Sequence, residues 1–475
     1  MLLSRLFFFL PKRGILSEKQ TEVSMEYDVI IVGAGLAGLS CGYELSRRGK
    51  SVLLMETHPY AGGRTSSFTD DGMKVESGLH RYIGYYSALP RLLKGCGVEL
   101  NDIVTWEEKV DILMKDRQGK VVLGVAPLWG FAKAVKSMTG NGAFLSWRDK
   151  FSLVPFFLRG FGSYLFSDRL DDYSVAEYAG KCGVTENALN RVLEPLSTGI
   201  FFLPVREYSA YAFFGLFAPA IPKFYKMRIG AFLGGMTELM CDPIVAQIRS
   251  RGGVVHFEET AGKVLLEQGA VTGVRTTDGR TYRGRCTVIA TPLSAAKTLL
   301  SPLREEPSLA SFFRLPEMSS CTLQLELDAP ALEKDITTFG PGTDMVSFAE
   351  QSRTVFSDSP GRLSVILGHP EQYIRRTAED IREVVVSEMA SLGVSLEGHI
   401  LDIRKVAEEN EFYSLTKGNQ RLRPPQKTAV PGLVLAGDYT LTSSFATMEG
   451  AVISGRKAAK VCLAGLNRQE LSGGK

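Results

Sequence analysis

A glycine-rich turn between a buried strand and a helix constrains the fold of this chain more than any other feature. Residues 27–33 are mostly apolar and end in glycine, as a parallel strand covered on both faces does. Helical spacing follows in residues 38–48, and residues 51–56 return to a strand pattern. The turn itself comprises Gly33, Ala34, Gly35, Leu36, Ala37 and Gly38. We therefore expect one βαβ unit near the N-terminus.

The spacing of these glycines is typical of a dinucleotide-binding turn. Gly33 makes a tight turn, Gly35 lets the backbone approach a pyrophosphate, and Gly38 lets the helix pack closely on the strand. The start of the helix supplies backbone N–H groups for the anion. Glu56 ends the second strand, where an acid accepts hydrogen bonds from ribose hydroxyls. We assign the whole turn and Glu56 to a cofactor site, with a turn of purely structural role as the alternative.

A second glycine turn follows the acid and favours FAD over NAD as the cofactor. It contains Gly62, Gly63, Arg64 and Thr65. These residues bring a backbone and a guanidinium within reach of phosphate or flavin. We assign Gly63, Arg64 and Thr65 to the cofactor site, although the same residues are compatible with a surface turn.

The length and texture of the chain predict two domains. Its 475 residues exceed one ordinary core. Aromatic-rich helical stretches, such as residues 151–166 and 200–217, occupy the region from 106 to 228, and residues 254–291 alternate like an antiparallel β-meander. We expect an α/β, Rossmann-type FAD-binding domain of residues 26–105, 229–300 and 426–466. Residues 106–228 and 301–425 then form a discontinuous α+β substrate domain, 1–25 a disordered leader and 467–475 a tail.

Charge and cysteine content exclude several classes of protein. The formal net charge of +3 gives no electrostatic reason to expect a nucleic-acid partner. The 7 cysteines are scattered singly, so we expect no metal site and a reducing, cytoplasmic compartment. The apolar run at residues 6–10 is too short to span a bilayer, and no other stretch reaches about 18 uninterrupted apolar residues.

Four further motifs together resemble one group of flavoproteins. They are Glu-Ser-Gly-Leu-His at 76–80, Ala-Thr-Pro at 290–292, Leu-Ala-Gly-Asp-Tyr-Thr at 435–440 and Met-Glu-Gly-Ala at 448–451. On these motifs the chain is similar to the FAD-dependent amine oxidase and phytoene desaturase superfamily, and most similar to the plant and cyanobacterial type of carotenoid desaturase. The resemblance extends from residue 27 to 463 and implies an FAD cofactor. Residues 440–450 contain no Cys or His, so we expect the FAD to be non-covalent.

The resemblance places the C-terminal motifs beside the flavin. Gly437 gives the backbone close access to the cofactor, and Asp438 accepts a hydrogen bond from a ribityl hydroxyl. The last helix, which Gly450 and Ala451 begin, points its N-terminus at the pyrimidine end of the flavin, where its partial positive charge stabilises the reduced ring. The remaining residues assigned to the cofactor are Met448, Glu449 and Val264.

His80 and the aromatic residues each have two interpretations. The resemblance places His80 in a loop beside the flavin ring, as a proton acceptor or a hydrogen-bond donor, and a structural histidine is the alternative. The aromatic residues of 151–225 form either core packing or an apolar tunnel for a polyene. Arg159, Lys223, Lys226 and Arg228 lie beside an apolar patch that we expect to contact a membrane surface.

These observations predict an FAD-dependent oxidoreductase that desaturates a long apolar isoprenoid, either a carotenoid precursor or a related triterpenoid. The flavin takes a hydride and passes electrons to a quinone or to oxygen. Gly437-Asp438 replaces the Gly-Glu usual in amine oxidases and speaks against amine oxidation. Redox-neutral polyene isomerisation and a flavin-binding scaffold without turnover also stay open. The resembling desaturases have an arginine where residues 210–221 have no basic residue, so the substrate itself is open.

Overall fold

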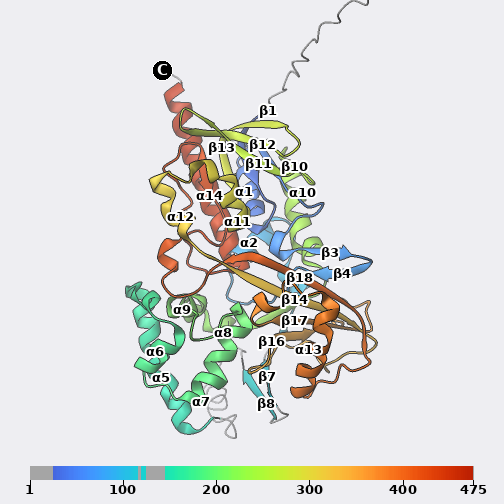
Figure 1. The fold of residues 1–475 in the computed structure, drawn as a ribbon. Coiled ribbons are helices and arrows are strands. Elements are labelled where there is room, and N and C mark those ends of the chain that lie inside the picture. Colours follow the sequence, from blue (N-terminus) through green and yellow to red (C-terminus); the bar gives the residue numbers. More distant parts are fainter. Residues whose placement is uncertain (1–24, 108, 116–118, 125–144, 474–475) are drawn as a thin grey trace, which may run out of the picture.

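The computed structural model describes residues 25–107, 109–115, 119–124 and 145–473, and Figure 1 shows their fold. The predicted leader, up to residue 24, lies outside the described residues. The first βαβ unit folds as predicted. β1 (Met25–Val32) and β2 (Val52–Met55) pair in parallel, and α1 (Leu36–Ser46) connects them. α1 is buried along almost its whole length, as a helix covered on both sides requires.

A seven-stranded sheet carries this unit. Its order is β10-β2-β1-β13-β12-β11, and β19 also pairs with β13. The further strands are β10 (Val254–His256), β11 (Ala261–Glu267), β12 (Ala270–Thr276), β13 (Thr281–Ile289) and β19 (Leu433–Leu435). β13 pairs in parallel with β1 and β19 and antiparallel with β12, so it joins the Rossmann-type part of the sheet to a small meander.

The predicted four-strand meander is wrong in its first strand. β10 pairs in parallel with β2, at the opposite end of the sheet from β11 and β12. Residues 254–256 alternate like any half-buried strand, and a period of two does not distinguish parallel from antiparallel pairing. Only β11, β12 and β13 form the antiparallel meander.

A second sheet lies below the first in Figure 1 and has the order β18-β14-β17-β16-β15-β7-β8. Its strands are β7 (Lys109–Met114), β8 (Gly119–Gly124), β14 (Glu317–Leu327), β15 (Thr338–Phe339), β16 (Met345–Glu350), β17 (Gly361–Leu367) and β18 (Ile400–Tyr413). Apolar residues of β14 and β17 pack against α13 (Ala378–Ser391) in one core. The smaller pairings join β3 (Ser67–Asp70) to β4 (Met73–Glu76), and β9 (Ile229–Phe232) to β5 (Tyr82–Ile83) and β6 (Val104–Glu107).

Of the two aromatic helices that the sequence predicted, the structure contains the first and breaks the second. α5 (Trp147–Phe166) is continuous and starts at a capping box in which Ser146 and Asp149 bond reciprocally. The predicted helix at 200–217 is broken, because Phe202 adopts a left-handed conformation after α8 (Glu194–Phe201) and Ser209 caps α9 (Ala210–Phe217). The others here are α6 (Val175–Lys181) and α7 (Glu186–Ala188).

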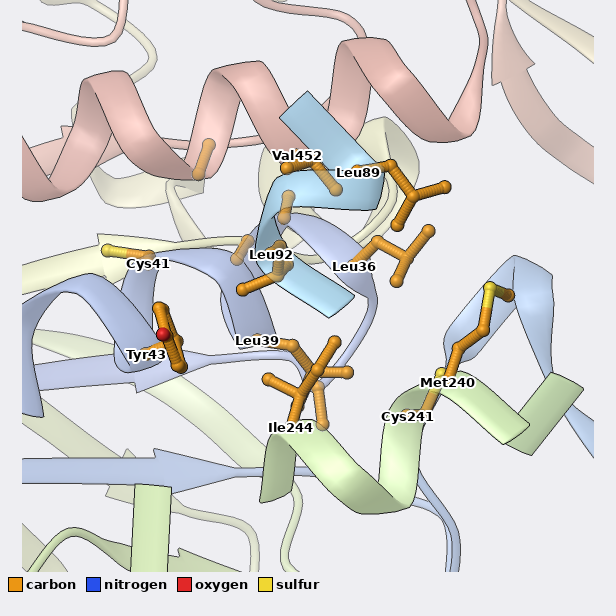
Figure 2. Close-up of a cluster of buried hydrophobic side chains, with 14 of the residues drawn as sticks. Leu36, Leu39, Cys41, Tyr43, Leu89, Leu92, Met240, Cys241, Ile244 and Val452 are labelled. Carbon is orange, nitrogen blue, oxygen red and sulfur yellow. The ribbon is translucent and has the colours of Figure 1, made fainter. Parts of the chain in front are cut away.

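The last helix, α14 (Met448–Gly473), returns to the first sheet and packs along α1. Figure 2 shows Val452 of α14 above Leu36 and Leu39 of α1. Leu89 of α2 (Ala88–Gly95) lies beside them, and Ile244 of α10 (Asp242–Ser250) lies on the other side. α14 continues through residues 467–473, where a tail was expected. The remaining helices are α3 (Leu100–Ile103), α11 (Leu293–Leu299) and α12 (Ala310–Arg314).

The first sheet draws its strands from residues 25–55, 254–289 and 433–435, and the second from residues 109–124 and 317–413. We retain the division into an FAD-binding and a substrate domain as a proposal. Among the described helices, none combines the length and apolar character that crossing a membrane requires.

Candidate functional site

The glycine turn leaves an open space in front of the N-terminus of α1. Gly33 has a φ of +104°, which only glycine adopts readily. A Cβ on Gly38 would lie 1.9 Å from the carbonyl oxygen of Gly33, so the helix can approach the strand only without a side chain there. A Cβ on Gly35 would meet only the carbonyl oxygen of Gly62, at 3.8 Å. The space in front of Gly35 is therefore free for a ligand.

The carboxylate of Glu56 is held in place by hydrogen bonds, one of them from the glycine turn. Its Oε2 accepts a hydrogen bond from the N–H of Ala34 at 2.7 Å, and its Oε1 accepts one from the N–H of His58 at 3.1 Å. Each carboxylate oxygen has two lone pairs, so acceptor capacity for a ribose hydroxyl remains. Glu56 thus orders the glycine turn as well as offering a ligand contact.

The second glycine turn packs directly on the first. The N–H of Gly62 donates to the carbonyl of Ala34 at 2.9 Å, and Gly62 and Gly63 both have positive φ, at +124° and +56°. Thr65 closes the turn by donating from Oγ1 to the carbonyl of Gly62 at 2.9 Å. The structure therefore brings Gly63 and Thr65 to the glycine turn, whereas the side chain of Arg64 reaches across to the C-terminal motif.

Arg64 pairs with acids from two distant segments. Its Nη2 donates to Oδ1 of Asp438 at 2.6 Å, and its Nε lies 3.7 Å from Oε1 of Glu411. Burial raises the pKa of Glu411 to about 6, although the charge of Arg64 opposes this shift. Asp438 is only 4% exposed. A single guanidinium therefore serves both carboxylates.

Residues 437–442, called the flavin turn below, connect β19 to the segment before α14. Gly437 has a φ of +145°, and its N–H donates to Oγ of Ser454 at 2.9 Å. Oγ1 of Thr440 lies 2.7 Å from the same Ser454 oxygen. The flavin turn is thus attached to α14 by Ser454, a residue that the motif search did not assign to the site.

At the start of α14, the backbone amides that lack a partner are not the ones that we predicted. Thr447 caps the helix, with Oγ1 accepting from the N–H of Gly450 at 3.1 Å and its carbonyl accepting from the N–H of Ala451 at 3.0 Å. Gly450 and Ala451 are therefore not the free donors that we expected. Within the described residues, no acceptor binds the N–H groups of Met448 and Glu449, so these two amides carry the partial positive charge of the helix start.

The side chain of Glu449 binds the N-terminus of α2. Its Oε1 accepts from the N–H groups of Ser87 and Ala88, both at 2.8 Å, and its Oε2 accepts from the N–H of Leu89 at 2.9 Å. The buried carboxylate thereby caps the N-terminus of α2 from the first turn of α14. Of the residue's groups, only the backbone amide is available to a ligand.

His80 lies in the loop between β4 and β5 and is neutral at physiological pH. Burial, assisted by the nearby charge of Arg64, lowers the pKa of His80 to about 4, although the bond to the Gly78 carbonyl opposes the shift. Nδ1 lies 3.1 Å from that carbonyl oxygen, an arrangement that requires the proton on Nδ1. Nε2 then carries a lone pair of low basicity.

Val264 and the aromatic residues have surroundings that suit packing. Val264, which we assigned to the cofactor, is buried in β11. The backbone that pairs with Glu56 is a different segment, since the N–H of Glu56 donates to the carbonyl of His256 and the carbonyl of Glu56 accepts from the N–H of Glu259. The rings of Phe156, Phe213 and Phe214 are fully buried and contact one another, which makes these three residues part of a core.

Two side chains that the sequence analysis missed hold the flavin turn. Gln426 donates from Nε2 to Oγ1 of Thr440 at 2.8 Å, and Arg423 donates from Nη2 to the carbonyl of Asp438 at 2.9 Å. Neither residue belongs to a recognisable local motif. No group of His, Cys, Asp and Glu side chains suited to a metal ion occurs within the described ranges.

A flavin nucleotide fits this arrangement. The space in front of Gly35, the unpaired amides of α1 and the acid Glu56 suit a pyrophosphate and a ribose, and the flavin turn and the free amides of α14 suit the ring system. Fold and site together define a Rossmann-type flavin-dependent oxidoreductase.

Comparison with known proteins identifies the family. The family model described as flavin containing amine oxidoreductase matches residues 36–463. The chain belongs to this family. The 15-cis-phytoene desaturase of Arabidopsis thaliana is 29% identical over 90% of this chain and 78% of its own length. The 15-cis-phytoene desaturase of Synechococcus elongatus is 26% identical over 92% and 96%, and a probable zeta-carotene desaturase of the same organism is 26% identical over 92% and 98%.

Solved structures share the fold at lower sequence identity. An oxidoreductase from Methanosarcina mazei matches with a TM-score of 0.72 and 18% identity, over 92% of this chain and 100% of the other. A putrescine oxidase variant matches with a TM-score of 0.69 and 16% identity, over 93% and 99%. The likeness to these two structures concerns the fold alone.

Proposed function

We propose that the chain is an FAD-dependent desaturase that removes a hydride and a proton from adjacent carbons of a long apolar isoprenoid, a carotenoid precursor or a related triterpenoid. The observation that carries the proposal is the similarity to phytoene and zeta-carotene desaturases over nine tenths of the chain. The electron acceptor is a quinone or oxygen.

The ion pairs of the site favour an apolar substrate over an amine. An ammonium group requires an acid or an aromatic cage. Asp438 and Glu411 both pair with Arg64, so neither carboxylate is left for an ammonium. Phe445 is buried against Tyr211 of α9, with ring centroids 5.7 Å apart, and a Cβ on Gly215 would lie 2.0 Å from the Phe445 ring. This ring packs into the protein instead of forming a cage.

FAD held at this site would supply the acceptor for the hydride. The chain itself binds and orients the cofactor through Gly35, Glu56 and the flavin turn. The free N–H groups of Met448 and Glu449 favour negative charge in front of α14. Neutral His80 offers Nε2 as a weak acceptor for the departing proton. Because residues 440–450 contain no Cys or His, FAD is held without a covalent bond.

Anaerobic flavin bleaching tests the proposal. The purified protein is mixed with phytoene, ζ-carotene, squalene or putrescine in liposomes, and the flavin absorbance is followed. We expect bleaching by at least one polyene or triterpenoid and none by putrescine, and release of FAD on denaturation. Bleaching by the amine alone would assign the chain to amine oxidation, and conversion of a polyene without bleaching would assign it to isomerisation.

We also propose that α5 contacts a membrane surface, from which such a substrate enters. Apolar side chains at helical spacing face outward on α5, with Trp147 54% exposed, Leu158 72% and Phe166 89%. Arg159, next to Leu158 in α5, is exposed, and so is Lys226 in the segment 218–226. Lys223 and Arg228 have other partners, since Lys223 donates to the carbonyl of Tyr85 and Arg228 lies 3.6 Å from the Trp106 ring centroid. The outward face of α5 is thus apolar with the basic Arg159 beside it, a pattern typical of an interfacial helix.

Liposome flotation tests the membrane proposal. Leu158→Asp should reduce binding to anionic vesicles by about tenfold, because burying a charge in the interface is unfavourable. Leu401→Asp is the matched control, because Leu401 is 60% exposed on β18 of the second sheet. Equal binding of wild type and both variants would contradict the assignment to α5.

A further inference from the structure

A short segment, residues 423–426, runs along the flavin turn and fixes it by hydrogen bonds. Gln426 Nε2 donates to Oγ1 of Thr440 at 2.8 Å and to the carbonyl of Leu441 at 3.1 Å. The N–H of Leu441 donates to the carbonyl of Pro424 at 2.8 Å. The flavin turn is therefore held between this segment on one side and Ser454 of α14 on the other.

Arg423 makes most of its contacts to the same turn and is almost fully buried, at 3% exposure. Its Nη2 donates to the carbonyls of Asp438 at 2.9 Å and Thr440 at 2.5 Å. The same nitrogen lies 3.1 Å from Oγ1 of Thr442. The guanidinium therefore satisfies the backbone of the turn from the protein side.

The positive charge of Arg423 is not neutralised by a paired acid. Among the described residues, no carboxylate forms an ion pair with Arg423, and its Nε has no acceptor. Asp438 offers only its carbonyl, because its carboxylate pairs with Arg64. The guanidinium instead lies 5.1 Å from the ring centroid of Tyr413 and 4.7 Å from that of Phe445. A buried charge without a counter-ion is costly, and it acts strongly on nearby charge because the local dielectric constant is low.

The field of this charge reaches the first turn of α9 and the third turn of α14. Burial and, next in size, the charge of Arg423 lower the pKa of Lys457 in α14. Burial raises the pKa of Tyr211 in α9, and the charge of Arg423 opposes that shift. α9 carries no basic residue of its own. Arg423 is therefore a buried source of positive potential between α9, the flavin turn and α14.

We propose that Arg423 is a positioning residue that fixes the flavin turn and, through its unpaired charge, stabilises negative charge on a flavin bound there. The charge favours the reduced ring, which carries more electron density than the oxidised ring. This inference rests on the proposed flavin site but is independent of the substrate.

The flavin midpoint potential, measured by dye equilibration without substrate, tests the proposal. Arg423→Gln keeps an amide donor and removes the charge, so the equilibrium constant for flavin reduction should fall about tenfold, a shift of about 30 mV to more negative potential for a two-electron couple. Arg423→Lys keeps the charge but lacks the planar fork. The equilibrium constant for flavin reduction should therefore stay within about twofold of the wild-type value, while FAD affinity and Tm fall.

Lys460→Met is the matched control. Lys460 lies on the same helix, α14, one turn beyond Lys457, and its side chain is exposed to solvent. Its removal should leave the potential unchanged, because water screens the charge. An unchanged potential in Arg423→Gln would overturn the electrostatic role.

If Arg423→Gln does not retain flavin, the test rests on Arg423→Lys. A tenfold fall in the equilibrium constant for flavin reduction in that variant, which keeps the charge, would likewise overturn the electrostatic role. A wild-type protein that holds no flavin would instead overturn the proposed function itself.

Discussion

At the glycine turn the chain makes room for a ligand by omitting side chains, whereas at the flavin turn it adds them. Gly33 and Gly38 bring strand and helix together, and the space before Gly35 stays open. The flavin turn instead depends on the side chains of Arg423, Gln426 and Ser454. A close backbone approach is encoded by neighbouring residues, but a network of side chains needs partners from distant segments. The two ends of one site therefore respond differently to mutation.

Substitution of the glycines should have the largest effect. Gly38→Val places a Cβ 1.9 Å from the Gly33 carbonyl oxygen, so we expect no folded protein. Gly35→Val is accommodated by the protein but fills the ligand space, so the protein should fold with FAD affinity reduced by more than about 100-fold. Flavin fluorescence titration and circular dichroism measure the two effects. Gly180→Val, where an added Cβ meets nothing within 4 Å, is the control. Strong FAD binding by Gly35→Val would exclude the open space as the pyrophosphate site.

Glu449→Ala should have the next largest effect, because it breaks a side-chain contact at the other end of the site. The N–H groups of Ser87, Ala88 and Leu89 would lose their acceptor. We expect the free energy of unfolding to fall by about 3 kcal/mol, and by less for Glu449→Gln, which keeps one acceptor oxygen. Urea unfolding of the FAD-loaded protein measures the loss. A change below about 0.5 kcal/mol would show that α2 keeps its position without this cap.

Glu56→Ala tests the one acidic side chain on which the glycine-turn end depends. The change should weaken FAD binding by about 1–3 kcal/mol through loss of the ribose contact and of the bond that orders Ala34. Glu56→Gln should lose less, because it retains an acceptor for the Ala34 N–H. The dissociation constant of FAD is the measurement, with Glu26→Ala, an exposed acid in β1, as control. An unchanged constant would remove Glu56 from the site.

His80→Ala should have the smallest effect, because His80 lies between the two ends and is a weak base. We expect flavin reduction by substrate to slow by about tenfold, or about 1.4 kcal/mol. With a pKa of about 4, His80 gains a proton only when the pH falls toward 4, so the ratio of wild-type to variant rates should be constant above about pH 5.5. Stopped-flow reduction across this pH range gives the ratio. A wild-type ionisation near pH 6.5 that the variant lacks would contradict a neutral His80.

The glycine turn and the flavin turn also differ in how far the sequence alone predicts them. The glycine turn was predictable because a positive φ and a close approach depend on residue types a few positions apart. The cap on Gly450 is also a local feature, since Thr447 is a preferred N-cap residue three positions before it. The partner of Glu449 was not foreseeable, because Leu89 lies 360 positions away.

The fold shows the same limit. Burial patterns predicted β1, α1 and β2 correctly, but they could not assign β10 to a parallel pairing with β2. The aromatic residues of α5 and α9 were equally compatible with a core and a tunnel, because both interiors are apolar. Phe156 and Phe214 prove to pack on each other, with ring centroids 5.0 Å apart. Arg423 gave no local signal, since its partners are backbone carbonyls that any sequence supplies.

The contact between α1 and α14 also has a consequence for biosynthesis. Ser40 donates from Oγ to the carbonyl of Val452, which the ribosome adds 412 residues later, and a Cβ on Gly455 would lie 2.1 Å from the carbonyl oxygen of Ala37. At about 5–20 residues per second, α1 waits roughly 20–80 s for this partner. During that interval its apolar surface has no permanent cover and is a target for chaperones. The site between α1 and α14 is then complete only after α14 has been synthesised.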